Sequence, residues 1–277
     1  MLQGALSTLF SVHPNPGTGA SALPNGAEIR VLDRRIFNVT RPSDNFLRSQ
    51  MRWLRAYADL RYDRAHEINV QIGDILSFFG MTGHLNNSMR KYTLELLTVA
   101  QMVTIGVELQ AKHFCWSPRP IHFSDQVQPI IQTPDHSTFP SGHATEAFVI
   151  ATILSRLAYG QPAHDALAAW QPPFRVAHRI ATNRTIAGVH FPADNAAGAL
   201  LGCMIGEAIY AFATGPSVPV FRAEFDLAAG PALGFDEDAD LTADWLRGLA
   251  PFASEGNPIF SDPILADFWA LAAGEWA

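Results

Sequence analysis

The sequence of 277 residues has little cysteine, little lysine and few charged side chains. Its two cysteines, Cys115 and Cys203, are too few and too far apart for a disulfide framework or a cysteine metal site. Charged residues make up 16% of the chain and the formal net charge is −7, whereas nucleic-acid-binding proteins usually carry a basic excess. Lys91 and Lys112 are the only lysines, so most positive charge comes from arginine. We therefore expect a small-molecule substrate and no nucleic-acid partner.

Long uninterrupted apolar runs are also missing. The most apolar stretch, 196–213, contains Glu207, and neither it nor 148–157 offers about 20 consecutive apolar residues. The first 22 residues lack the basic start and continuous apolar segment of a signal peptide. These absences predict a soluble protein with no membrane span, cytoplasmic or, if a signal was removed, periplasmic or secreted.

What the chain does contain is helical periodicity. Hydrophobic residues make up 48% of it, enough for a substantial core. From Ser43 onward apolar residues recur every three to four positions, while alternating strand patterns are scarce. The expected fold is all-α, a helical bundle with long active-site loops between helices. Helices are expected at about 43–60, 63–79, 92–112, 142–159, 175–184 and 194–212.

Composition suggests three parts of the chain. Residues 1–30, rich in Pro, Gly, Ser and Asn, are expected to form an extended N-terminal arm, and residues 31–214 the helical domain. Residues 215–277 form an acidic C-terminal segment, since residues 224–277 hold eleven Asp and Glu against one basic residue, Arg247. This segment has a short amphipathic stretch near 241–249 and an apolar end. It could pack on the body, on a partner subunit or across a pocket mouth, and a homodimer is consistent with it.

The first motif places a lysine at the end of a predicted helix and an arginine seven residues later. Lys112 and Arg119 flank a loop in which Pro118 and Pro120 stand beside the arginine. An ammonium and a forked guanidinium together can clamp an anion. Basic residues near helix ends also commonly satisfy the last carbonyls, so this pair alone is weak evidence.

The second motif is Pro140-Ser141-Gly142-His143, at the start of the helix expected over 142–159. Ser141 is a candidate N-cap, and the helix start directs backbone N–H groups at an anion, with the hydroxyl as a further donor. His143 is placed for proton transfer. A capped helix with an idle histidine is the alternative.

The third motif runs from Arg184 to Asp194, with His190 six residues after the arginine. An imidazole needs a partner on its other nitrogen to fix the tautomer, and either Asp194 or a backbone carbonyl could supply it. Gly188 would let the backbone approach an anion closely. Together the three motifs predict one pocket for a tetrahedral oxyanion, phosphate or vanadate.

In this order, the motifs resemble those of the superfamily joining type 2 phosphatidic acid phosphatases, bacterial class A acid phosphatases and vanadium-dependent haloperoxidases. The resemblance spans residues 112–194, about a third of the chain, and the helical reading of 40–212 fits the superfamily's bundle. The third motif usually begins Ser-Arg, but here it begins Asn183-Arg184. Asparagine can still donate and accept hydrogen bonds.

The resemblance implies a role for each motif residue. His190 would attack phosphorus or coordinate vanadium as the metal ligand, and His143 would protonate the leaving group or handle the protons of peroxide. Asp194 would orient His190 as the third catalytic residue. The anion-binding residues would be Lys112, Arg119, Ser141, Gly142 and Arg184.

Two enzymatic hypotheses follow. A vanadium-dependent haloperoxidase, with vanadate as cofactor and halide and hydrogen peroxide as substrates, is slightly favoured by the residues leading to Ser141 and by the apparent lack of membrane segments. A phosphomonoesterase acting on a phosphoester through a phosphohistidine, with no cofactor, is the alternative. The phosphomonoesterase is favoured by the loop Ser117-Pro118-Arg119-Pro120. Cys115 also favours it, because a hypohalous product would readily oxidise an exposed thiol.

A third hypothesis, from a different class, is a non-catalytic anion-binding protein that retains the pocket. His113, His136 and His178 also lie near the motifs, but a solvated or structural histidine is the simpler interpretation of each.

Overall fold

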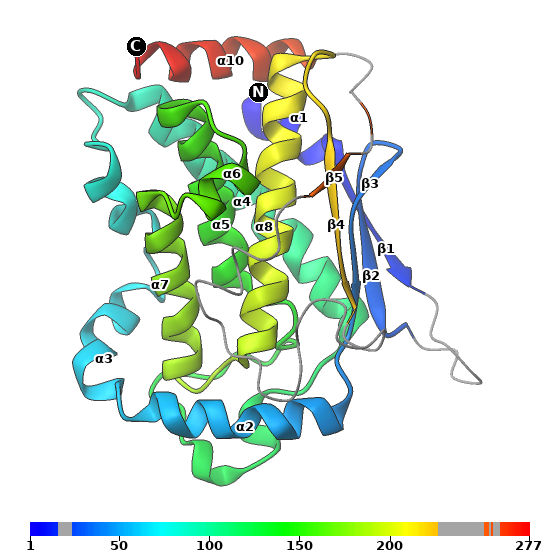
Figure 1. Cartoon of the computed structure of the whole chain (residues 1–277), viewed down its shortest axis with the longest axis vertical. Coiled ribbons are helices and arrows are strands. Elements are labelled where there is room, and N and C mark those ends of the chain that lie inside the picture. Colours follow the sequence, from blue (N-terminus) through cyan, green and yellow to red (C-terminus); the bar gives the residue numbers. More distant parts are fainter. Residues whose placement is uncertain (16–23, 227–251, 255, 257–260) are drawn as a thin grey trace.

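The computed structural model describes residues 1–15, 24–226, 252–254, 256 and 261–277. Helices dominate it, packed as a bundle beside a small sheet (Figure 1). The predicted helical stretches are helical, with boundaries shifted by a few residues; the stretch 63–79 divides into α3 and a 3₁₀ segment. The helices are α1 (Leu2–Leu9), α2 (Asp44–Ala58), α3 (Arg61–Val70), α4 (Lys91–Cys115), α5 (Gly142–Tyr159), α6 (Ala163–Ala168), α7 (Pro172–Ile186), α8 (Pro192–Thr214) and α10 (Pro263–Gly274), with 3₁₀ turns η1 (Leu76–Thr82), η2 (Pro120–His122) and η3 (Asp125–Val127).

Helix α8 runs through the middle of the bundle and packs most closely on α5. Glycines at four-residue spacing make this approach possible. A Cβ on Gly198 would lie 2.5 Å from the Ser141 carbonyl oxygen, and one on Gly202 would lie 2.4 Å from the Thr145 carbonyl oxygen. Because real side chains do not approach so closely, these glycines set the spacing of the two helices. The first turns of α5 and α8, which carry two of the motifs, therefore lie side by side.

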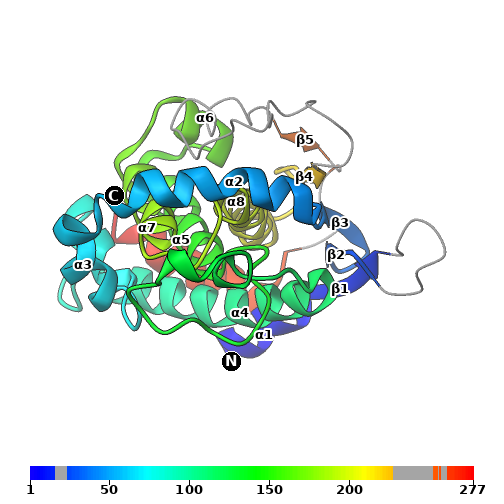
Figure 2. The same ribbon diagram turned by 90° about the horizontal axis from the view of Figure 1, so that it is seen from below.

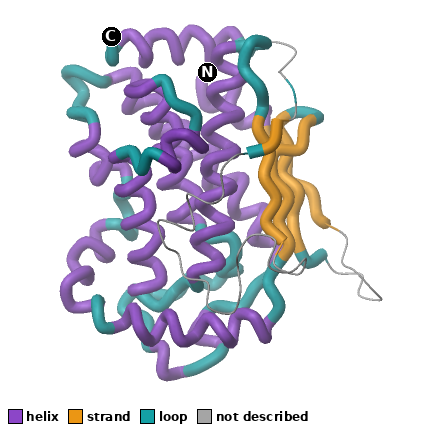
Figure 3. The backbone as a smooth tube through the Cα atoms, in the orientation of Figure 1, coloured by secondary structure: helices purple, strands orange, loops and turns teal. Residues whose placement is uncertain are grey.

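A five-stranded sheet covers one side of the bundle, so the all-α expectation is incomplete (Figure 3). The signal was present, because Ala27, Ile29 and Val31 alternate with polar residues and are buried. The strand order is β1-β2-β3-β4-β5, with β3 and β4 parallel and the other pairs antiparallel. The strands are β1 (Phe10–Asn15), β2 (Gly26–Val31), β3 (Arg34–Thr40), β4 (Phe221–Asp226) and β5 (Ala253–Ser254).

The N-terminal residues do not form an extended arm as far as they are described. Helix α1 buries Leu2, Leu6 and Leu9 against the core, and β1 forms the edge of the sheet. Burial of these three leucines stabilises a packed helix at the start of the chain, although the residues that follow are rich in proline and glycine.

The C-terminal segment packs on the body through α10, which contacts α4 and α8. Glu275 caps the start of α4, accepting hydrogen bonds from the backbone N–H groups of Tyr92 (2.8 Å) and Thr93 (2.9 Å). The amphipathic stretch expected near 241–249 lies outside the described residues.

The C-terminal ends of α4 and α7 and the N-terminal ends of α5 and α8 meet at one end of the bundle. Helix α2 crosses this end, and the loop between α4 and α5 lies beside it (Figure 2). All three sequence motifs are at these helix ends.

Candidate active site

The fold brings the three motifs into one buried site. Helix α4 supplies Lys112 and the following loop supplies Arg119. Helix α7 supplies Arg184 near its end, and His190 precedes the first turn of α8. These four residues are at most 5% exposed. Burial of so many cations is costly unless a negative partner enters, which favours an anion site.

His190 is held by two neighbours on its Nδ1 side. The Asp194 Oδ2 atom lies 3.3 Å from Nδ1, and the Thr138 hydroxyl oxygen lies 3.0 Å from it. That carboxylate oxygen also accepts hydrogen bonds from the Thr138 hydroxyl (2.5 Å) and the Phe191 backbone N–H (2.9 Å). A carboxylate beside Nδ1 favours the proton on Nδ1 and leaves the Nε2 lone pair available for attack.

Burial, followed by the positive charge of Arg119 and Lys112, lowers the pKa of His190 well below its usual value. The imidazole is therefore neutral at physiological pH, as a nucleophile must be. Its Nε2 lies 3.3 Å from the Arg119 Nη1 atom, which places a cation beside the nitrogen that Asp194 and Thr138 leave free.

Both basic residues of the first motif hold the loop before α5. The Lys112 ammonium donates to the backbone carbonyls of Ser137, Thr138 and Pro140, the last at 2.6 Å. Arg119 donates to the carbonyls of Val189 (2.9 Å) and His136 (3.2 Å). These contacts fix Thr138 beside His190. The two cations therefore organise the loop as well as supplying positive charge.

Two side-chain donors of the site, Ser141 Oγ and Arg184 Nε, are buried and lack a hydrogen-bond partner among the described residues, and the acceptor Asp194 Oδ1 is buried without one as well. Ser141 is the N-cap of α5 by position, but its side chain makes no capping hydrogen bond. Orphaned donors are rare in protein interiors and require an explanation. A bound oxyanion would satisfy both.

Gly142 has a packing role that the motif did not suggest. A Cβ at this position would lie 2.2 Å from Glu108 Oε1 on α4, so glycine leaves room for this buried carboxyl group beside the start of α5. Gly188, at φ +83°, has the left-handed backbone that favours glycine. A Cβ there would approach Arg61 and Val127, so its role too concerns packing as well as backbone conformation.

His143 and Arg184 share a partner that the sequence analysis missed, Gln71, which directly follows α3. The Gln71 backbone carbonyl lies 2.8 Å from His143 Nε2, and its side-chain Oε1 accepts from Arg184 Nη2 at 2.8 Å. A carbonyl only accepts, so Nε2 of His143 carries the proton. Burial, then the charge of Arg184, lowers the pKa of His143 to about 3. No motif marks Gln71, because its importance comes from how α3 packs on α7.

Asn183, where the superfamily usually has serine, joins the same network. Its amide nitrogen donates to Glu67 Oε1 (2.9 Å) and Gln71 Oε1 (3.1 Å). Glu67 in turn forms an ion pair with Arg179 (2.6 Å). The asparagine therefore connects Arg184 to α3.

A cavity of about 290 Å³ leads from the surface to Arg119. Exposed Trp116 lines it, and His136 lies there with its Nδ1 3.3 Å from Arg119 Nη2. By contrast, Phe139 and Phe191 are fully buried. Away from the site, His113 contacts Phe114 and His178 contacts Trp170.

Comparison with known proteins agrees with the geometry. The model of the PAP2 superfamily matches residues 92–215, which include every predicted motif residue. The resemblance predicted from the three motifs is thereby confirmed.

Curated relatives match part of this region. Decaprenylphosphoryl-5-phosphoribose phosphatases from two strains of Mycobacterium tuberculosis are 34% identical over 107 residues, which is 39% of this chain. The match spans 54% of those relatives' length. Among solved structures, the chain is similar to a transmembrane PAP2 type phosphatidylglycerolphosphate phosphatase from Bacillus subtilis, with 19% identity and a TM-score of 0.42, covering 59% of this chain and 84% of that one.

The expectations of a soluble protein and of no membrane span are corrected. The segment 91–122, which contains α4, and the helix α8 are long and apolar enough to cross a membrane by length and composition. A helix can be apolar enough to span a membrane even when a charged residue interrupts its apolar run. Glu207, which interrupts the run in α8, is buried and paired with Arg156.

Proposed function

We propose that this protein is a phosphatase that hydrolyses a phosphate monoester through a phosphohistidine at His190. The observation that carries the proposal is the arrangement around that imidazole. Asp194 and Thr138 hold its Nδ1 side, and the Nε2 atom faces Arg119. The two orphaned donors, Ser141 Oγ and Arg184 Nε, supply hydrogen bonds for the oxygens of a phosphoryl group.

In the proposed reaction, His190 Nε2 attacks phosphorus and the ester P–O bond breaks. The leaving oxygen takes a proton from His143, whose pKa rises when the negative charge of the substrate enters among the arginines. A water molecule then attacks the phosphohistidine, the P–N bond breaks, and His143 recovers a proton from that water. Inorganic phosphate leaves and both histidines return to their starting states.

The matched relatives support the phosphatase over the haloperoxidase that the sequence slightly favoured. Those named above are phosphatases, and none of these comparisons points to a haloperoxidase. Cys115, however, does not distinguish the two hypotheses, because the residue is 1% exposed and its thiol is therefore protected from a diffusible oxidant.

Orthovanadate fits the same donors, since it is a tetrahedral oxyanion like phosphate. Arg119, Arg184 and Ser141 would hold its oxygens and His190 would approach the metal. When bound in a haloperoxidase, vanadate activates hydrogen peroxide for halide oxidation. In the proposed phosphatase it is an inhibitor that competes with substrate.

The test compares hydrolysis of p-nitrophenyl phosphate with halogenation of a dye by peroxide and bromide, each with and without orthovanadate. We expect hydrolysis that vanadate inhibits competitively and that His190→Ala lowers by about 10⁴-fold or more. Burst labelling with a ³²P ester should trap a phosphoprotein in the wild type alone. Vanadate-stimulated halogenation that requires His190, without hydrolysis, would overturn the proposal in favour of the haloperoxidase. Saturable vanadate binding without either activity would instead favour the anion-binding protein.

A further inference from the structure

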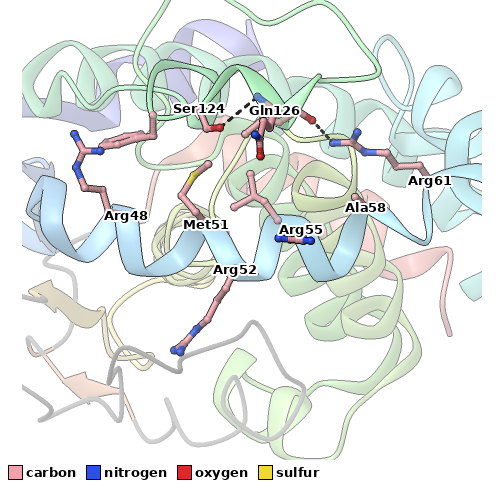
Figure 4. Close-up of a pocket in the computed structure, with 11 residues that line it drawn as sticks. Arg48, Met51, Arg52, Arg55, Ala58, Arg61, Ser124 and Gln126 are labelled. Carbon is pink, nitrogen blue, oxygen red and sulfur yellow. Dashed lines mark hydrogen bonds between the residues drawn. The ribbon is translucent and has the colours of Figure 1, made fainter.

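A groove of about 660 Å³ separates α2 from the loop that carries η3 (Figure 4). Its volume falls within the range of small-molecule sites in proteins. The groove is distinct from the site described above, because none of the predicted motif residues lines it. Its lining also contains no aspartate or glutamate.

The inner side of the groove is apolar. Met51, Leu54 and Ala58 recur on α2 at three- and four-residue spacing and form one wall. Phe123 and Val127 form the opposite wall. Because Met51, Ala58 and Phe123 are only partly buried, an apolar ligand would remove further surface from water there.

The outer edge of the groove is made by arginines on the neighbouring face of α2. Arg48 and Arg55 are exposed and seven residues apart, which places them about 10 Å apart along the helix at roughly 1.5 Å per residue. No carboxylate among the described residues forms an ion pair with either of them. Arg48 stacks on the Phe123 ring at 5.1 Å, so its guanidinium is held beside the apolar wall.

The remaining two arginines differ from this pair. Arg61 donates to the backbone carbonyls of Val127 (2.8 Å), Gln128 (3.0 Å) and Ile186 (2.9 Å). It therefore closes one end of the groove as a structural residue. The Arg52 side chain extends from the opposite side of α2 in Figure 4, away from the loop.

We propose that this groove binds a small amphiphilic anion, with its apolar chain between Met51 and Phe123 and its anionic group at Arg48 and Arg55. Guanidinium groups suit such a ligand because their planar forks match the oxygens of a phosphate, sulfonate or carboxylate. An apolar wall with a cationic edge and no acidic residue complements both halves of the molecule. Neither an inorganic anion nor a neutral amphiphile would satisfy the whole site.

The groove is close enough to the site to influence it. Phe123 packs edge-to-face on Phe191, with ring centroids 5.7 Å apart, and Phe191 follows His190 in the chain. The binding proposal itself needs no catalysis, so it stands or falls independently of the proposed hydrolysis.

The experiment is calorimetric titration of the whole protein with 1-octanesulfonate below its micellar concentration. Saturating orthovanadate blocks the motif site, and the sulfonate cannot be hydrolysed. Inorganic sulfate and octyl glucoside, titrated separately, represent the two halves of the probe. We expect octanesulfonate to bind at least tenfold more tightly than either, with an affinity that falls as salt rises.

Variants assign the binding to the groove. The double variant Arg48→Gln/Arg55→Gln should weaken octanesulfonate binding by about tenfold or more. Met51→Gln should weaken it by about threefold to tenfold while leaving the arginines in place. Arg175→Gln, which removes an exposed arginine of α7 outside the groove, is the matched control and should bind as the wild type does.

Several outcomes would overturn the proposal. Undetectable binding of octanesulfonate would do so, as would wild-type binding by the folded double variant, checked by circular dichroism. Equally tight binding of octyl glucoside would show apolar adsorption, and equally tight binding of sulfate would show a simple anion site.

Discussion

The two histidines of the site lie in one pocket but are held by different parts of the chain. His190 is oriented by Asp194 and Thr138, which both lie within the PAP2 match over residues 92–215. His143 instead contacts Gln71, which lies outside that match. The surroundings of His190, the proposed nucleophile, therefore come from the matched region, while those of His143, the proposed proton donor, include a residue that follows α3. Substitutions that act on only one of the two histidines test whether the two are held independently.

The largest expected effect separates proton transfer from anion binding. His143→Ala should lower kcat for p-nitrophenyl phosphate by about 10²-fold to 10³-fold, because it removes the general acid. Arg184→Ala should weaken orthovanadate binding by about tenfold or more, because it removes charge-assisted hydrogen bonds. His143→Ala should spare vanadate affinity more than Arg184→Ala does. Competitive inhibition gives both affinities, and equal losses would contradict these assignments.

On the nucleophile side, Asp194→Asn should lower kcat by about 100-fold with little change in vanadate affinity. The amide keeps the shape of the side chain but no longer fixes the proton on His190 Nδ1 by charge. The trapped ³²P-phosphoprotein should form correspondingly slowly. Asn195→Asp, which changes charge at the adjacent buried position on α8, serves as a comparison for unspecific damage. A wild-type rate in Asp194→Asn would show that Thr138 alone orients the imidazole.

On the proton-donor side, Gln71→Glu should weaken vanadate binding by about tenfold, because a carboxylate would then pair with Arg184 and repel the anion. Gln71→Ala should have a smaller effect, since it removes a hydrogen bond without adding charge. Gln110→Glu, an exposed position on α4, is the charge-matched control. If Gln71→Glu binds vanadate as the wild type does, α3 has no influence on the arginine.

The smallest expected effect is on the pH dependence. The pKa of His190 is lowered, so the nucleophile stays unprotonated as the pH falls through 6.5. The pKa of His143 is about 3, so its protonated form becomes more common as the pH falls. Burial raises the pKa of Asp194 to about 6, so the carboxylate that holds the proton on His190 Nδ1 is lost as the pH falls through that value. Between pH 8 and 6.5, kcat/KM, corrected for substrate ionisation, should therefore not decrease, and below about pH 6 it should fall in the wild type but not in Asp194→Asn. A tenfold decrease with a midpoint near 6.5 in Asp194→Asn would show that His190 titrates as an exposed imidazole.

Much of the site was predictable because its residues lie at helix ends with strong local signals. Ser141 and Gly142 mark the start of α5, and the acidic residue four positions after His190 was a candidate partner for its imidazole. Gln71 was not predictable, since it follows a helix without a motif, and its place beside His143 comes from the packing of that helix on α7. The alternation of apolar and polar residues around Ile29 indicated a strand, but the helical pattern of the rest of the chain favoured an all-α prediction.

The sequence by itself determined the helices, the three motifs and the PAP2 match, because periodicity, glycine positions and charged residues are local properties of the chain. Only the tertiary structure decided which partners the motif residues use. Lys112 and Arg119 hold a loop, Gly142 makes room for Glu108, and His143 contacts Gln71. Those contacts join residues up to 72 positions apart. They depend on how the helices pack, which no local pattern specifies.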